Sequence, residues 1–193
     1  MTRTATPSQT VGPFFHDGLS RPGWSDLTGG GRAAGQVIRI AGRLRDGDGA
    51  PVDDAVIEIW QANAAGRYAH PEDRQERPLD PAFRGFGRAF TGRDGGYAFT
   101  TIRPGPVPGR GNAWQAPHIN VAVFARGLLK RLTTRLYFPA EPLNETDPVL
   151  NSIDDPALRR TLLAVAEAAE GETPRYRFDI VLQGEGETVF FAV

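Results

Sequence analysis

Short apolar runs, separated by turns that are rich in glycine, proline and aspartate, dominate the chain. The run at residues 37–44 ends at the turn DGDGAP, and the run at residues 56–60 is followed by the turn NAAG at residues 63–66. Apolar runs of this length, bounded by such turns, are typical of β-strands. The pattern therefore predicts two strands in the first third of the chain.

The same pattern predicts further strands and one long excursion beyond this point. Residues 88–90 and 97–102 flank the turn TGRDGG and are predicted to form a hairpin. The sequence of residues 69–87 is polar and broken by prolines, which is typical of a loop that crosses the surface. Residues 101–138 are then predicted to form a strand, a loop rich in proline and glycine, and two more strands joined by a turn.

One segment near the C-terminal end favours a helix. Asp155 is a suitable N-cap, Pro156 suits the first helical position, and Gly171 suits the C-terminal end. The apolar residues that fit one face of this helix are Leu158, Leu162, Leu163, Val165, Ala166 and Ala169. Two last strands are expected, because residues 176–182 alternate between apolar and polar side chains and residues 189–193 follow a QGEGE turn. The predicted fold class is mostly β: a β-sandwich of mixed or antiparallel sheets with one peripheral helix and long loops.

The first 35 residues show little sign of regular structure. We therefore divide the chain into an N-terminal arm and loop, residues 1–35, and a sandwich domain, residues 36–193. Phe14 and Phe15 stand side by side in the arm. Chain ends are often loosely ordered, but two adjacent phenylalanines are seldom left in water, so we expect the arm to pack against something.

The composition narrows the classes of function. The 193 residues suit one domain with a sizeable core, and the net charge of -1 favours neither nucleic acid nor an anionic membrane as a partner. The chain has no cysteine, which excludes disulfides, thiolate metal sites and a cysteine nucleophile. No apolar run reaches membrane length and no secretory signal is evident, so a cytoplasmic location is expected.

Three side chains are candidates for chemistry. His118 and Asn120 stand two residues apart on a predicted strand, so their side chains share one face of it. Tyr68 follows a predicted turn. Taken singly, Tyr68 is well explained as a packed turn tyrosine, and His118 as a hydrogen-bonded histidine of the core. The sequence contains no glycine-rich phosphate loop, nucleophile elbow or HExxH motif.

Four stretches of the chain together resemble the intradiol ring-cleavage dioxygenases. They are IRIAGRLRDGDGAPVDDAVIEIWQANAAGRY, GRAFTGRDGGYAFTTIRPGPVPG, NAWQAPHINVAVF and TRLYF, in the order that the family has them. The two ends of the chain, TPSQTVGPFF and YRFDIVLQGEGETVFF, resemble the branch of the family that cleaves protocatechuate. The resemblance covers nearly the whole chain.

The resemblance implies a non-haem Fe(III) site held by two tyrosinates and two histidines, because anionic phenolates stabilise a hard ferric ion. Matched one by one, the four ligand positions are Tyr68, Val107, His118 and Asn120. Valine cannot ligate iron, and an asparagine amide is a poor replacement for imidazole. We therefore expect these positions to be vestigial, with no metal bound and no catalytic residue in this chain.

This substitution pattern resembles the α subunits of the protocatechuate-cleaving branch. The resemblance implies a hetero-oligomer of αβ units, in which a homologous β subunit binds Fe(III) and cleaves protocatechuate, a small aromatic acid, with O2. It also implies that Thr10, Gly12 and Pro13 of the arm line the substrate pocket of the β subunit, and that Arg135 adds a cation that favours an anionic substrate. Arg135 could equally form a salt bridge at the surface or between strands.

Two other functions remain open from the sequence. The first is a self-sufficient intradiol dioxygenase with an altered ligand set, which would show the burgundy colour of tyrosinate-to-iron charge transfer in the isolated chain. The second is a plain β-sandwich binding module, which would have no activity in any mixture of subunits.

Overall fold

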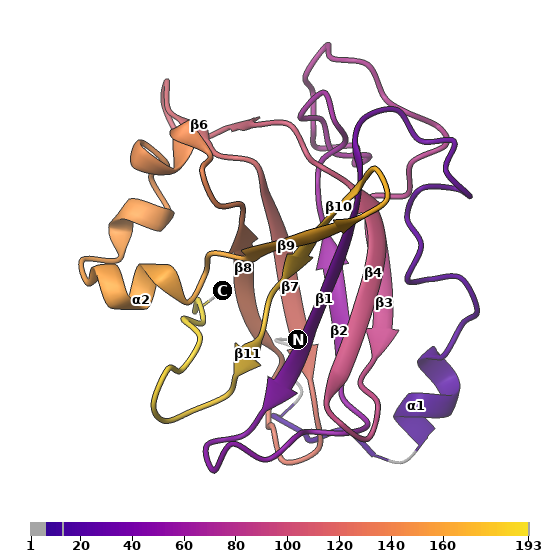
Figure 1. The fold of residues 1–193 in the computed structure, drawn as a ribbon, viewed down its shortest axis with the longest axis vertical. Helices are drawn as coiled ribbons and strands as arrows, with labels where there is room; N and C mark the ends of the chain where they lie inside the picture. The colour runs from indigo at the N-terminus through magenta and orange to yellow at the C-terminus, as the bar shows by residue number, and fades with distance from the viewer. Residues whose placement is uncertain (1–6, 13, 193) are drawn as a thin grey trace, which may run out of the picture.

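The computed structural model describes residues 7–12 and 14–192. Two β-sheets lie face to face, with helix α2 at one side of the sandwich and helix α1 at the other (Figure 1). Within the described residues, no helix has the length and apolar character that a membrane span needs. The elements in chain order are α1 (Phe14–Leu19), β1 (Val37–Arg45), β2 (Val56–Trp60), β3 (Phe86–Phe90), β4 (Gly96–Ile102), β5 (Val107–Pro108), β6 (Trp114–Gln115), β7 (His118–Phe124), β8 (Leu132–Tyr137), the 3-10 helices η1 (Pro142–Glu145) and η2 (Leu150–Ser152), α2 (Pro156–Arg160), β9 (Val165–Glu170), β10 (Thr173–Arg177) and β11 (Ile180–Val181).

The two sheets differ in their strand directions. In the first sheet β1 pairs antiparallel with β4 on one side and parallel with β10 and then β11 on the other, and β9 pairs antiparallel with β10. The second sheet is antiparallel, in the order β3-β2-β7-β8. β5 and β6 form a separate two-stranded ladder. The predicted sandwich of mixed and antiparallel sheets is confirmed.

The core lies between the two sheets and follows from the two-residue period of the strands. On β1, Ile38, Ile40 and Leu44 are buried, and alternate residues of β2, β4 and β7 join them in one cluster. Each fully buried Ile or Leu stabilises the fold by about 2 kcal/mol relative to an exposed one. Leu27, from the segment that precedes the first strand, is also fully buried in this cluster, so that segment contributes to the core.

The opposite face of the four-stranded sheet, here called the outer face, carries the candidate chemistry. On β7 the residues that alternate with the core positions include His118, Asn120 and Phe124, and they lie on this outer face. α1 covers one end of the face, where the rings of Phe15 and Phe124 pack with centroids 5.7 Å apart. Asn120 and Phe124 are four residues apart, or about 13 Å along a strand. The arm and the predicted ligand positions therefore lie toward opposite ends of β7.

The arm contacts its own chain at several points. Besides the packing of Phe15 on Phe124, Gly127 N–H donates a hydrogen bond to Thr10 Oγ1 at 2.8 Å. Phe14, by contrast, is 83% exposed. One of the two adjacent phenylalanines thus packs as expected, and the other leaves an apolar side chain on the surface of this chain.

The predicted helix over residues 156–170 is wrong beyond its first turns. α2 begins as predicted, with Asp155 Oδ1 accepting a hydrogen bond from Ala157 N–H at 2.7 Å. The helix ends at Arg160, however, and residues 165–170 form β9 instead.

Tertiary pairing explains why the helix stops. Tyr137 on β8 binds the chain that follows α2: its N–H donates to Leu162 O at 2.8 Å, and its carbonyl accepts from Ala164 N–H at 2.9 Å. Gly171, with φ 63°, then turns the chain from β9 into β10. The strand ladder formed across this turn outweighs the intrinsic helix preference of the segment, which is rich in alanine and glutamate.

The predicted hairpin of residues 88–90 and 97–102 is also wrong. The TGRDGG turn does form, with Gly95 N–H donating to Gly92 O at 2.8 Å. β3 nevertheless pairs with β2 and β4 pairs with β1, so the turn carries the chain from one sheet to the other. Apolar alternation identifies the strands but does not specify the partner of each.

The two strands predicted at the C-terminal end need correction as well. The strand at residues 176–182 is interrupted at Phe178, whose carbonyl accepts a hydrogen bond from the Tyr97 hydroxyl at 2.5 Å. A Cβ at Gly42 would lie 1.8 Å from that carbonyl oxygen, so only glycine fits beside the break. Residues 189–192 form no strand, and the last residue lies outside the described part of the chain.

Candidate functional site

Three side chains of the outer face stand in register across neighbouring strands. Trp60 on β2 pairs with Asn120 on β7, and Asn120 pairs with Arg135 on β8. Residues opposed in this way have Cβ atoms about 5 Å apart, close enough for their side chains to interact. Arg135 Nε donates to Asn120 Oδ1 at 3.1 Å, and Asn120 Nδ2 donates to the carbonyl oxygen of Trp60 at 3.2 Å.

Tyr68 and His118 complete this group. The Tyr68 ring stacks on Trp60, with centroids 5.8 Å apart and an interplanar angle of 16°. The Tyr68 hydroxyl lies 3.4 Å from His118 Nε2 and 3.4 Å from Asn120 Nδ2. His118 Nδ1 lies 2.7 Å from the carbonyl oxygen of Ala116, so we assign the proton to Nδ1 and leave Nε2 as an acceptor. The structure thus brings together three of the four predicted ligand positions.

The fourth predicted position, Val107, lies in the short β5–β6 ladder beside the group. Val107 is buried and pairs with Gln115 in that ladder. Gln115 Oε1 accepts a hydrogen bond from Arg135 Nη1 at 2.7 Å, and Gln115 Nε2 donates to Pro108 O at 3.2 Å. The loop rich in proline and glycine therefore supplies a buried apolar wall at Val107 and a polar partner for Arg135.

Among the residues that the structure describes, Arg135 has only neutral hydrogen-bond partners. Besides Asn120 and Gln115, it donates from Nη1 to the Tyr137 hydroxyl at 3.3 Å, and that hydroxyl donates to Asp147 Oδ1 at 3.2 Å. No carboxylate lies within ion-pair distance of Arg135 among the residues that the structure describes. The salt bridge that was the alternative explanation for this residue is therefore not formed there.

Burial sets the protonation of the group. Burial, assisted by the nearby Arg135 charge, lowers the pKa of the His118 imidazole to about 4, so this histidine is neutral at pH 7. Burial also raises the pKa of Tyr68, although the Asn120 hydrogen bond and the Arg135 charge act in the other direction. Burial likewise raises the pKa of Tyr137. At neutral pH the site consists of two phenols, a neutral imidazole and one cation.

These residues do not fit a ferric ion. Asn120 turns its amide nitrogen, a donor, toward the Tyr68 oxygen, and its carbonyl oxygen is occupied by Arg135. Val107 offers no ligand atom, and the Arg135 guanidinium places a positive charge among the remaining donors, Tyr68 and His118. The described residues also contain no cluster of three or more His, Cys, Asp or Glu side chains suited to a metal. We derive no iron chemistry from this chain.

The members of this group other than Asn120 line a cavity of about 700 Å³ that opens on the surface. A cavity of this size accommodates a small organic ligand. Exposed loop residues, among them His70, Glu72 and Arg74, contribute to its lining. The remaining lining residues include Trp60, Tyr68, Val107, Gln115, His118 and Arg135.

The residues predicted to line a partner's pocket lie at two separate places. Arg135 lines the cavity of its own chain. Thr10 and Gly12 are exposed, and Thr10 is bound to Gly127, which follows the opposite end of β7. Pro13 lies outside the described residues.

Two polar residues of the site escaped the sequence interpretation. Tyr137 stands two residues after Arg135, so strand alternation alone places both side chains on one face, and this signal could have identified it. Asp147 comes from the loop before η2, where no local pattern points to the site. It is fully buried, and its Oδ2 accepts from Ala116 N–H at 2.7 Å.

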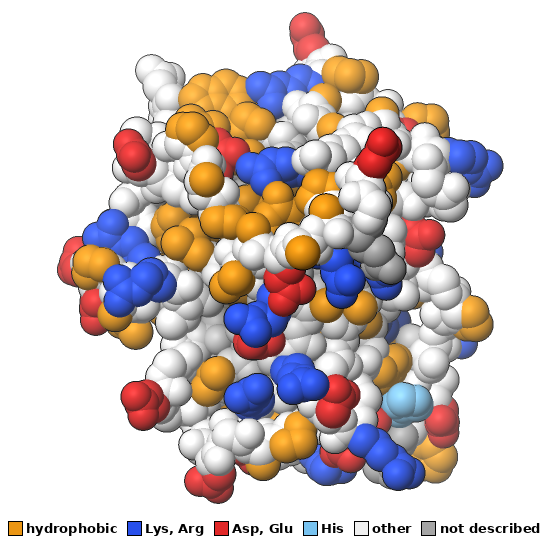
Figure 2. Space-filling model, in the orientation of Figure 1, with side chains coloured by type: hydrophobic (Ala, Val, Ile, Leu, Met, Phe, Trp, Pro, Cys, Tyr) orange, Lys and Arg blue, Asp and Glu red, His pale blue; other side chains and the backbone are white. Residues whose placement is uncertain are grey.

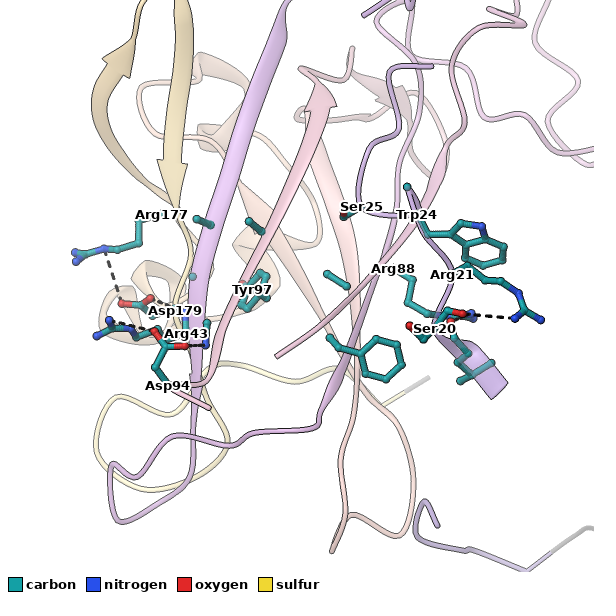
Figure 3. Close-up of a pocket in the computed structure, with 18 of the residues that line it drawn as sticks. Ser20, Arg21, Trp24, Ser25, Arg43, Arg88, Asp94, Tyr97, Arg177 and Asp179 are labelled. Carbon is teal, nitrogen blue, oxygen red and sulfur yellow. Dashed lines mark hydrogen bonds and ion pairs between the residues drawn. The ribbon is translucent and has the colours of Figure 1, made fainter. Parts of the chain in front are cut away.

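A larger hollow of about 900 Å³ runs over β1 and β4, and it contains none of the predicted positions (Figure 3). Some of its charged side chains are paired with one another: Arg43 lies 3.4 Å from Asp94, and Arg177 lies 3.8 Å from Asp179. Positive and negative side chains are interspersed over the face of the molecule shown in Figure 2. The smaller cavity is the candidate site, because Tyr68, Val107, His118 and Arg135 line it.

Comparison with known proteins decides the family. The family model Dioxygenase_C, described as Dioxygenase, matches residues 12–184. The protocatechuate 3,4-dioxygenase alpha chain of Pseudomonas putida is 42% identical over 198 residues, covering 96% of this chain and 95% of its own length. The chain belongs to the intradiol ring-cleavage dioxygenase family. Enzymes of this oxidoreductase family use non-haem Fe(III).

The chain is similar to both kinds of protocatechuate 3,4-dioxygenase subunit. In Burkholderia cepacia, the protocatechuate 3,4-dioxygenase alpha chain is 40% identical over 204 residues, covering 100% of this chain and 99% of its own. The beta chain of the same organism is 38% identical over 185 residues, covering 94% of this chain and 77% of its own.

Solved structures of the family share the fold. The dioxygenase domain of a carbohydrate-binding fusion protein from Streptomyces sp. SirexAA-E superposes with a TM-score of 0.64 at 31% identity, covering 94% of this chain and 99% of that one. The 3-chlorocatechol 1,2-dioxygenase of Rhodococcus opacus 1CP has a TM-score of 0.62 at 22% identity, covering 81% of this chain and 62% of that one. At this level of identity the similarity supports the fold alone.

Proposed function

We propose that this chain is the subunit of a protocatechuate 3,4-dioxygenase that does not bind iron, the counterpart of the alpha chains that it resembles. In this proposal a homologous β chain binds Fe(III) and cleaves protocatechuate to 3-carboxy-cis,cis-muconate with O2, while this chain supplies no catalytic residue. The observation that carries the proposal is the position of Arg135. Its guanidinium, bound to Asn120 at 3.1 Å, stands among the positions that correspond to the iron ligands of the family.

Overall similarity does not distinguish the two kinds of subunit, since the alpha and beta chains of Burkholderia cepacia are 40% and 38% identical to this chain. The local chemistry supports the α-type assignment. Val107 and Asn120 replace two ligands, and Arg135 introduces a cation beside the two that remain. Each of these three residues disfavours iron binding, although the rest of the chain matches the family well. This combination is consistent with a subunit whose role is to provide contact surface and pocket shape.

The exposed residues of the N-terminal arm support the proposal that this chain contacts a partner subunit. Thr10 and Gly12 are exposed, and Phe14 presents most of its ring to solvent although the chain buries Phe15 beside it. We propose that Thr10, Gly12 and Pro13 form part of the wall of the β-chain substrate pocket and that Phe14 packs on the β chain nearby. Burying one phenylalanine side chain contributes about 2 kcal/mol to such a contact. Because Arg135 lines the cavity of this chain and is held there by Asn120 and Gln115, we assign it to the chain's own cavity.

Reconstitution tests the proposal. The full-length chain is purified alone and after co-expression with a protocatechuate 3,4-dioxygenase β chain, and protocatechuate-dependent O2 uptake is measured in both samples. We expect no uptake by the chain alone and uptake by the complex. A chain that consumes O2 with protocatechuate in the absence of any β chain would contradict the proposal and favour a self-sufficient dioxygenase.

A further inference from the structure

We propose that the hollow over β1 and β4 is a groove that binds an extended acidic segment of a partner polypeptide, which adds to the free edge of β4. The hollow shares no lining residue with the cavity around Arg135, and binding there requires neither a β chain nor iron. Three features of the hollow support this assignment: a strand edge without a neighbour, a floor of small side chains, and arginines that lack a counter-ion.

The edge of β4 that faces the hollow is only partly covered. On that side the segment before β1 reaches one end of the strand, where Thr100 N–H donates to Ser25 O and Leu27 N–H donates to Thr100 O, both at 2.9 Å. In an antiparallel pair every second residue turns its peptide groups away from the partner strand, so Ala98 faces the same side as Thr100. Among the described residues no strand or bridge is paired with Ala98 on that side, and Ala98 is exposed in the hollow. A free edge of this kind can form main-chain hydrogen bonds with an extended peptide.

Small side chains leave this edge accessible. On the floor of the hollow Ala98 stands opposite Ala41 of β1, and Gly96 stands opposite Arg43. Ala89 of β3 adds a further small residue to the lining. The hollow, of about 900 Å³, therefore lets an extended chain reach the backbone of β4 past side chains of that strand that are no larger than a methyl group.

The charges that line the hollow leave a positive excess, because five arginines line it against three acidic residues. Each of the three acids already lies beside an arginine. Asp94 is 3.4 Å from Arg43, and Arg177 lies 3.9 Å from Glu167 and 3.8 Å from Asp179. No acidic residue of the lining is thus left to neutralise the other arginines.

Two of those other arginines have no counter-ion. Arg88 pairs with Glu58, which does not line the hollow. In the part of the chain that the structure describes, no carboxylate lies within ion-pair distance of Arg21 or Arg45. Figure 3 shows Arg21 on the opposite side of the hollow from Arg43, which shares one face of β1 with Arg45. An acidic segment that spans the hollow can therefore pair with one arginine on each side, which a neutral or basic segment cannot.

Matched peptides separate the contribution of charge from that of the backbone. The isotope-labelled full-length chain is titrated with acetyl-SEVES-amide and with acetyl-SQVQS-amide, which has the same length and no charge, and the amide signals are followed by NMR. We expect the acidic peptide to shift the signals of Gly96 and Ala98. It should bind about fivefold more tightly than the neutral one, because two exposed ion pairs each add a small factor in affinity.

Two methylated analogues of the acidic peptide test the addition to the strand edge. One is N-methylated at both glutamates and the other at valine, so each lacks the N–H donors of one edge of the extended peptide. Since successive peptide groups face opposite edges, only one analogue should bind more weakly, by at least about fivefold for the loss of main-chain hydrogen bonds.

Exposed arginines provide a matched pair of variants. Arg21→Gln combined with Arg45→Gln should remove the preference for the acidic peptide. Arg110→Gln combined with Arg131→Gln removes two exposed arginines that do not line the hollow, and this control should keep the preference. All four residues are exposed, so we expect both double variants to fold.

Several results would overturn the proposal. They are equal affinity for the acidic and the neutral peptide, equal binding of the two methylated analogues, or no shift of Gly96 and Ala98 at millimolar peptide. Self-association of the chain that the Arg21 and Arg45 substitutions abolish, with no peptide bound, would assign the groove to a second copy of this chain and contradict the partner proposed here. Because the titration involves no β chain, its outcome is independent of the reconstitution experiment.

Discussion

Arg135 Nε donates a hydrogen bond to Asn120 Oδ1 at 3.1 Å, between residues that stand directly opposite each other on β8 and β7. The asparagine at this position is thus the acceptor that holds the arginine, and the two side chains act as one unit. In our proposal, they turn a position suited to binding a cation into one that already contains a cation.

Restoring the two missing ligands should show that Arg135 by itself hinders the binding of Fe(III). We expect the variant with Val107→Tyr and Asn120→His to bind little Fe(III), because the guanidinium still repels a trivalent ion at close range. Adding Arg135→Gln should raise iron binding close to one ion per chain and produce the colour of a tyrosinate-to-iron charge transfer. Metal analysis and visible absorbance measure both. If the double and triple variants bind iron equally well, the role given to Arg135 is wrong.

His118 should make the fold less stable in mild acid. Its pKa is about 4 in the folded chain and about 6.5 when unfolded, so between these values the unfolded state binds more protons. Stability from this group is present above pH 6.5 and is lost as the pH falls toward 4. Lowering the pH from 7.5 to 5 should therefore cost about 2 kcal/mol through this residue alone.

Urea unfolding of the unmodified chain and of His118→Gln at the two pH values measures that loss. The variant should lose about 2 kcal/mol less than the unmodified chain. His70→Gln, at an exposed histidine near the same cavity, serves as the matched control and should behave like the unmodified chain. An equal pH effect in all three proteins would contradict the buried neutral imidazole.

Gly42 on β1 should be required for stability, because it lies beside the break between β10 and β11. Gly42→Ala would place a Cβ 1.8 Å from Phe178 O, the carbonyl that accepts from the Tyr97 hydroxyl. Because backbone must move to relieve this overlap, we expect a loss of about 3 kcal/mol or more in the free energy of unfolding. Gly18→Ala, in α1 with nothing within 4 Å of the added Cβ, is the control and should change stability by less than about 1 kcal/mol. Equal effects of the two substitutions would refute this explanation of the break.

Phe14 should act between subunits and not within the chain. Phe14 is 83% exposed, so Phe14→Ser should leave the unfolding free energy within about 0.5 kcal/mol of its original value. If the ring packs on the β chain, the same change should weaken the complex by about 2 kcal/mol, or roughly 30-fold. Leu158→Ser, at an exposed leucine of α2, is the control. Sedimentation of the complexes that shows equal affinity for both variants would contradict the proposed contact.

The strands were largely predictable from the sequence, because their alternation reflects which face is buried. The same signal placed His118 and Asn120 on one face and would have placed Tyr137 beside Arg135. It could not identify the partner of each strand, and so the predicted hairpin between β3 and β4 proved to be a crossing between sheets. Residues 165–170 fitted a helical face, but strand pairing beyond Tyr137 decided their structure.

The site was predictable only in part for a similar reason. Resemblance to the family predicted four ligand positions and the residues that replace two of the ligands. It did not reveal that Asn120 and Gln115 together hold Arg135, since hydrogen bonds between side chains depend on register and on loop geometry. Asp147 could not be predicted as a site residue, because it comes from a loop whose sequence has no periodic pattern. The expected contribution of Arg135 to a partner's pocket therefore becomes, in our proposal, a role in the chain's own cavity.

Iron stoichiometry distinguishes a chain that binds no iron from one that keeps its own metal site. The measurement is the iron content and visible absorbance of the full-length chain, first alone and then as the purified complex with a β chain. We expect a colourless chain without iron, and a coloured complex that contains one iron for each pair of chains. A coloured chain with one iron of its own, or a complex with one iron in every chain, would show that Tyr68 and His118 retain a functional metal site despite Arg135.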